Sequence, residues 1–105
     1  MNQERGHRGH KDLQVCRQVF DALTYALAEF DDPVIGDLVL VSVTPAPSAA
    51  RVQVNLVPAR AGVDREVALA RLAAIATELR TEVAAELTRR RVPELVFHVG
   101  YPDAV

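Results

Sequence analysis

Apolar residues recur at intervals of three and four positions along a first long stretch of the chain, which starts at Asp12. The apolar positions of this stretch are Cys16, Val19, Phe20, Leu23, Leu27 and Phe30. The spacing predicts a helix with one buried stripe. The helix should end near Asp31, because the α conformation is disfavoured for Asp32, the residue before Pro33. Residues 1–11 are polar and basic and lack the stripe, so we expect a flexible N-terminal arm there.

Two shorter stretches have the pattern of β-strands. Residues 37–44 are rich in Leu and Val, and we expect Pro45 and Pro47 to interrupt this strand with a loop. From Arg51 to Val57 apolar and polar residues alternate, which is typical of a strand with one solvated face. The two strands are close in sequence, which predicts a hairpin.

A second long helical pattern follows Asp64, a residue type favoured at the N-cap. Its stripe comprises Leu69, Leu72, Ala76, Leu79, Val83 and Leu87. The helical pattern reaches about Arg90 and ends before Pro93. The apolar residues of Glu94–Val99 predict a last strand. The order α–β–β–α–β predicts one α+β domain, with a mixed three-stranded sheet covered on one side by helices. The expected core is Leu23, Leu27, Val52, Val54, Leu56, Leu72, Leu79, Val83 and Phe97.

The second helix is too long for the domain. About 27 residues would span roughly 40 Å, whereas a chain of this length has a radius of gyration of only about 13 Å. We therefore expect a bend, although the helix contains neither Gly nor Pro. The predicted place is Ala74 to Thr77, because the Thr77 hydroxyl can compete for a backbone carbonyl.

Composition and charge narrow the function classes. The chain has 105 residues, which fits one domain, and a net charge of −2. Its one cysteine, Cys16, cannot form an intramolecular disulfide, which fits a reducing, cytoplasmic compartment. We expect the protein to be a monomer. No apolar run is long enough for a membrane span, and the polar N-terminus is unlike a secretory signal. Basic residues gather before Arg17 and at Arg89–Arg91, whereas acidic residues gather between Asp21 and Asp37, so a local basic surface is compatible with the overall charge.

The residues that could suggest catalysis or metal binding are better explained by structural roles. His7, His10 and Cys16 lack a fourth ligand, so we expect no metal, and Cys16 should be a small core residue. His98 should lie on the open sheet face without a nucleophile or carboxylate partner. Asp31 and Asp32 are ordinary residues for a turn before proline. We therefore expect neither a cofactor nor enzymatic activity.

Four short segments, in the same order, resemble the ribosome-binding factor A family. They are Asp32-Pro33 with Ile35-Gly36, Thr44-Pro45, the strand Ala50-Arg51-Val52-Gln53-Val54, and Arg91-Val92-Pro93-Glu94-Leu95-Val96-Phe97. The resemblance covers about residues 12–99, and it implies a type II K-homology fold for a domain over residues 12–102. It also implies binding to the immature small ribosomal subunit and its ribosomal RNA during late maturation, with roles in rRNA processing and in the cold.

The resemblance places the family's helix kink, an Ala-x-Gly motif, on Ile75-Ala76-Thr77, where the glycine is missing. For RNA contact we expect Thr77 and Arg80, on one flank of the long helix, together with Arg89, Arg90 and Arg91. On a straight helix Glu78 and Glu82 would form the opposite, acidic flank. Two alternative functions remain open. One is a K-homology-like nucleic-acid module unconnected with ribosomes, and the other is a protein-interaction domain in which RNA binding is weakened or lost.

Overall fold

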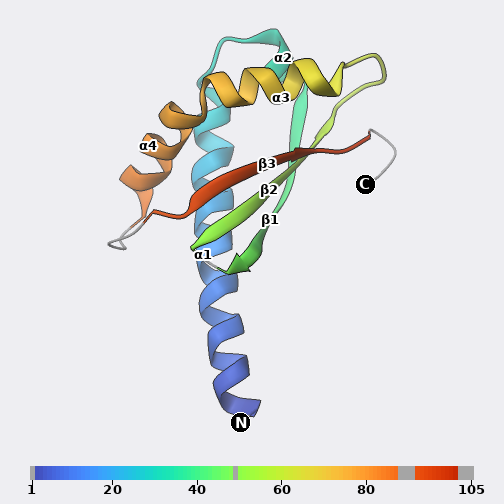
Figure 1. The fold of residues 1–105 in the computed structure, drawn as a ribbon. Helices are drawn as coiled ribbons and strands as arrows, with labels where there is room; N and C mark the ends of the chain where they lie inside the picture. The colour runs from blue at the N-terminus through green and yellow to red at the C-terminus, as the bar shows by residue number, and fades with distance from the viewer. Residues whose placement is uncertain (1, 49, 88–91, 102–105) are drawn as a thin grey trace.

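A mixed three-stranded sheet carries the helices on one face (Figure 1). The structure, a computed structural model, describes residues 2–48, 50–87 and 92–101. The elements in chain order are α1 (Asn2–Ala28), α2 (Pro33–Gly36), β1 (Leu38–Ser48), β2 (Arg51–Pro58), α3 (Arg65–Ala74), α4 (Ala76–Glu86) and β3 (Glu94–Val99). The predicted fold class and order of elements are therefore confirmed.

The sheet has the order β1-β2-β3, with β1 antiparallel and β3 parallel to β2. The predicted hairpin is present, but the prediction that Pro45 and Pro47 end its first strand is wrong. β1 continues to Ser48, and Pro45 pairs with Val52. Proline is tolerated because β1 is an edge strand, where a missing N–H need not cost a ladder hydrogen bond. The register shifts twice along β1, between Leu40 and Ser42 and between Pro45 and Ser48.

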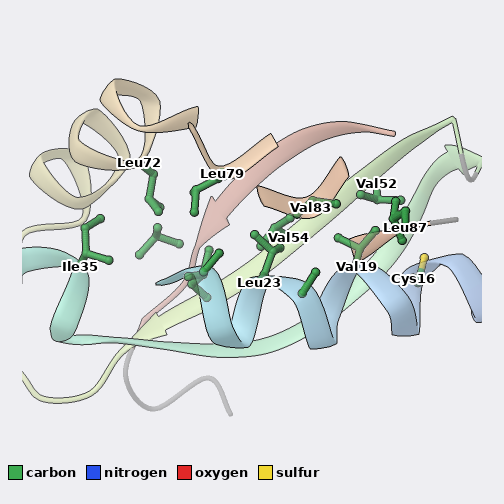
Figure 2. Packing of buried hydrophobic residues seen from close by; sticks show 14 of the residues in the cluster. Cys16, Val19, Leu23, Ile35, Val52, Val54, Leu72, Leu79, Val83 and Leu87 are labelled. Carbon is green, nitrogen blue, oxygen red and sulfur yellow. The ribbon is translucent and has the colours of Figure 1, made fainter. Parts of the chain in front are cut away.

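The core lies between α1, the sheet and the pair α3–α4 (Figure 2). Seven of the nine predicted core residues are buried: Leu23, Val52, Val54, Leu56, Leu72, Leu79 and Val83. Leu27 and Phe97 are only partly buried and pack against this cluster. Cys16 is buried within it, as predicted. Val99 is also fully buried, because β3 alternates and directs every second side chain toward the helices.

Helix α1 begins at Asn2, ten residues before the predicted start at Asp12. The prediction followed the buried stripe, but a helix can continue beyond its buried face where residues have high helix propensity. Residues 2–11 contain Gln, Glu, Arg and Lys, which are good helix formers, together with Gly6 and Gly9, which are poor ones. In the structure this part of α1 projects past the end of the sheet (Figure 1). That residues 1–11 form a flexible arm separate from the domain stays a prediction.

The second helical stretch is broken in two, within the range predicted for a bend. α3 ends at Ala74 and α4 begins at Ala76, while Ile75 between them has φ −108° and ψ 8°. These angles lie in the bridge region outside the helical range. α4 ends at Glu86, earlier than the predicted end near Arg90, because Leu87 is extended with φ −91° and ψ 140°.

Candidate nucleic-acid interface

The break at Ile75 lies between two fully buried leucines. Leu72 on α3 and Leu79 on α4 both point into the core, and Ile75 packs partly buried against it (Figure 2). The amide of Ile75 still donates to Arg71 O at 3.3 Å and to Leu72 O at 3.2 Å. The change of direction therefore lets both helices bury their apolar stripes in one small core, which a straight helix of the same length would overhang.

Arg80 projects from α4 next to the segment that leads into β3. Its Nη2 donates a hydrogen bond to the carbonyl oxygen of Val92 at 3.3 Å, and the side chain is exposed. A guanidinium carries five N–H donors in a planar fork, so one such bond leaves other donors for a phosphate. Arg89, Arg90 and Arg91, which precede Val92 in the sequence, lie outside the described residues.

Thr77 lies in an acidic environment that the sequence pattern did not show. It lines a hollow of about 390 Å³ together with Glu29, Phe30, Glu78, Thr81 and Glu82. The predicted separation between a Thr77 flank and an acidic flank is therefore wrong. A helical projection treats residues 64–90 as one straight helix, and it cannot include Glu29, which follows α1 far away in the sequence. A phosphate at Thr77 would face three carboxylates.

The paired aspartates at the end of α1 have a structural explanation for one member. The Asp32 Oδ1 atom accepts hydrogen bonds from Val34 N at 2.8 Å and Ile35 N at 3.3 Å, which caps α2. Its Oδ2 atom forms an ion pair with Arg71 Nη1 at 3.2 Å, which ties α2 to α3. These contacts support the interpretation of Asp32 as a turn and capping residue.

Two other candidate groups also take ordinary positions. His98 is exposed on β3, on the face of the sheet opposite the helices, as predicted. Within residues 2–48, 50–87 and 92–101, no three His, Cys, Asp or Glu side chains come together in a way that could hold a metal ion.

No described helix is both long and apolar enough to cross a membrane.

The open face of the sheet carries a hydrogen-bonded polar row that spans the hairpin. Asn55 Nδ2 donates to Ser42 Oγ at 3.0 Å, and Gln53 Nε2 donates to Asn55 Oδ1 at 2.7 Å. Strand alternation predicts that Gln53 and Asn55 face away from the core, but their partners depend on the register of β1, which the sequence does not show. Because these side chains form hydrogen bonds with one another, we interpret the row as an ordinary solvated face of the sheet.

Arg65 at the start of α3 fixes the end of β3. Its Nε donates to Val99 O at 2.7 Å, and its guanidinium carbon lies 4.3 Å from the centre of the Tyr101 ring. No pattern in the sequence indicates this contact, because the two residues belong to elements joined only through the tertiary fold.

Solved structures with the same arrangement of elements provide the comparison. No protein-family model matches the sequence, and a search of curated proteins finds no match. The crystal structure of ribosome-binding factor A from Thermus thermophilus matches with a TM-score of 0.72, covering 84% of this chain and 94% of that one at 23% identity. The chain has the fold of ribosome-binding factor A.

A second solved structure supports the assignment of the fold. It is the solution structure of a Thermotoga maritima protein proposed to be a ribosome-binding factor A. It matches with a TM-score of 0.62 and 14% identity, covering 88% of this chain and 85% of that chain. The predicted resemblance to the ribosome-binding factor A fold is thereby confirmed.

Proposed function

We propose that the protein is a ribosome biogenesis factor that binds the immature small ribosomal subunit and its ribosomal RNA during late maturation. In this role it would assist rRNA processing and growth in the cold, act in the cytoplasm and catalyse no reaction of its own. The observation that carries the proposal is the agreement of fold with ribosome-binding factor A over nearly the whole length of that protein. The four sequence segments that resemble the family add to it.

The position of the helix break also supports the proposal. The resemblance aligns the family's kink with Ile75-Ala76-Thr77, and the structure interrupts the helix at Ile75. A glycine is therefore not needed for the break in this chain, because buried Leu72 and Leu79 fix the directions of the two helices.

The charge distribution is compatible with RNA contact despite the net charge of −2. Residues 18–50 contain five carboxylates and no Lys, Arg or His, so the rest of the chain carries a net charge of +3. Phosphate contacts depend on the local field rather than on the total charge. The RNA surface is thus expected around Arg80 and the segment that leads into β3, which lie outside residues 18–50.

The proposed contact set is Arg80 with Arg89, Arg90 and Arg91. Arg80 is exposed and forms no ion pair with any described residue. Thr77 belongs to the same proposed set but should contribute least, because Glu29, Glu78 and Glu82 line its hollow. Contacts of this kind neutralise phosphates and carry no base sequence information.

Cosedimentation of the purified protein with immature and mature small subunits tests the function. We expect the protein to sediment with the immature particle and to be released as salt increases. Equal failure to bind either particle at low salt would contradict the proposal.

Two matched charge reversals test the surface. Arg80→Glu should weaken binding to small-subunit RNA of any sequence and flatten the salt dependence, because fewer counterions are released. Arg17→Glu makes the same charge change at an exposed position of α1 and should have a smaller effect. If the order of the two effects is reversed, the RNA surface lies along α1 instead.

The alternative function is a protein-interaction domain with weakened or lost RNA binding. The acidic hollow beside the helix break favours this alternative, because it occupies the place where the resemblance puts the kink. The alternative predicts no binding of the purified protein to small-subunit RNA across a salt series from low to physiological ionic strength.

A further inference from the structure

An apolar groove runs beside the outer edge of β1. The groove has a volume of about 360 Å³ and lies between α1, α2 and β1. Its lining includes Phe20, Leu27, Ile35, Gly36, Leu38 and Leu40. None of the described residues that line it is charged.

The backbone of β1 is available for pairing at this place. Among the described strands, β1 is hydrogen bonded to β2 alone, along one side. Ala59 N donates to Asp37 O at 2.7 Å, and in an antiparallel ladder such pairs alternate along the strand. The backbone groups of Leu38 and Leu40 therefore point away from β2, toward the open edge, while their side chains line the groove.

The edge is protected along only part of its length. Pro45 and Pro47 and the register shift after Leu40 blunt the second half of β1, and these are usual devices against unwanted pairing. The first half, from Leu38 to Val41, contains neither proline nor charge. It also exposes apolar side chains on its other face, with Val39 47% and Val41 40% accessible.

Charge distinguishes between the possible occupants of this edge. The groove and the edge belong to residues 18–50, which carry five carboxylates and no basic group. Asp32 is paired with Arg71, and Asp37 with Arg60 at 2.8 Å, a contact that raises the pKa of Arg60. Among the described residues the other three, Asp21, Glu29 and Asp31, have no ion-pair partner. A second copy of the chain would set acidic groups against acidic groups, and RNA would be repelled.

We propose that the first half of β1 and the adjacent groove bind an extended segment of a basic protein. The segment adds to the sheet as a fourth strand, with its backbone hydrogen bonded to Leu38 and Leu40. Its alternate apolar side chains enter the groove against Phe20 and Leu27. Its flanking Lys or Arg residues lie near Asp21 and Asp31. This surface is separate from the proposed RNA contact at Arg80. A test can therefore contradict one of the two proposals and leave the other unaffected.

A synthetic peptide with alternating Val and Thr and two Lys at each end is the probe. Binding of the fluorescently labelled peptide to the full chain is measured by anisotropy. We expect saturable binding that weakens with salt, and no binding of the same core flanked by Glu. Equal binding of the Lys and Glu peptides, or no binding of either, overturns the proposal.

Two variants block the groove without disturbing the core. Thr24 lines the groove and is exposed, so Thr24→Arg should weaken peptide binding at least about tenfold. Gly36 also lines it, and a Cβ there would meet no atom within 4 Å, so Gly36→Leu should have a similar effect on a folded protein. Ala73→Arg makes the same charge addition as Thr24→Arg at an exposed position of α3 and should leave binding unchanged.

Strand addition is distinguished from simple apolar adhesion by the peptide backbone. Methylating every second amide nitrogen of the peptide should abolish binding in one register and leave it nearly intact in the other, because only alternate groups face β1. Equal loss in both registers contradicts strand addition. Self-association of the chain in sedimentation equilibrium, abolished by Thr24→Arg, would instead assign the edge to a second copy.

Discussion

Helices α3 and α4 share one apolar layer but begin in different ways. α3 begins at a local signal, since the Asp64 side chain accepts hydrogen bonds from Glu66 N at 2.9 Å and Val67 N at 3.2 Å. α4 begins at Ala76, and its N-cap residue, Ile75, makes no side-chain capping hydrogen bond. The start of α3 is therefore encoded by neighbouring residues, whereas the start of α4 depends on what the two helices bury.

The largest effect should come from the packing that orients α4. Leu79 is fully buried next to the break, so Leu79→Ala should reduce the free energy of unfolding by about 2–5 kcal/mol. Val67→Ala removes two methyl groups from an exposed position of α3 and should cost less than about 0.5 kcal/mol. Urea denaturation of both variants measures the difference. Similar losses for the two would mean that the break does not depend on core packing.

A smaller loss of stability is expected at the start of α3, which is set by the neighbouring residue Asp64. Asp64→Ala removes the cap of α3 and should cost about 0.5–2 kcal/mol. Asp64→Asn is the matched control, because asparagine also caps well and should retain most of the stability. Thermal unfolding monitored by circular dichroism measures both. A loss for Asn as large as for Ala would show that the charge near the helix dipole matters more than the hydrogen bonds.

The smallest change in the free energy of unfolding is expected from two Ala→Gly substitutions, one inside α3 and one directly after the break. Ala70 is exposed within α3, so Ala70→Gly should cost about 0.5–1 kcal/mol. Ala76 is the first residue of α4 rather than an interior one, so Ala76→Gly should cost less. The two variants are compared by chemical denaturation under identical conditions. A larger cost at Ala76 would indicate that helical order continues through Ile75.

Much of the fold follows from local patterns in the sequence. The stripes of α1, α3 and α4 and the alternation of β2 predicted the order of elements and most of the core, because periodicity directly reflects burial. The cap at Asp64 and the turn at Asp32 followed from residue type alone. The extension of β1 through Pro45 did not, since it depends on β1 being an edge strand.

The candidate site was less predictable because its geometry joins distant segments. The hollow at Thr77 includes Glu29 and Phe30, which come from the end of α1 and meet α4 only in the folded chain. The contact of Arg80 with Val92 similarly depends on where β3 enters the sheet. A projection of one straight helix contains neither relation, so it separated Thr77 from Glu78 and Glu82, whereas in the folded protein all three line the same hollow.

The parallel pairing of β2 with β3 has a consequence for how the chain folds. β1 and β2 are neighbours in sequence, but the side-chain contact between Arg51 and Glu94 joins residues 43 positions apart. Such pairing requires a long loop to close, which is slow compared with forming a hairpin. During synthesis the hairpin and α1 can therefore associate first, while one edge of β2 stays open until β3 arrives. The nascent domain would be most prone to aggregate during that interval.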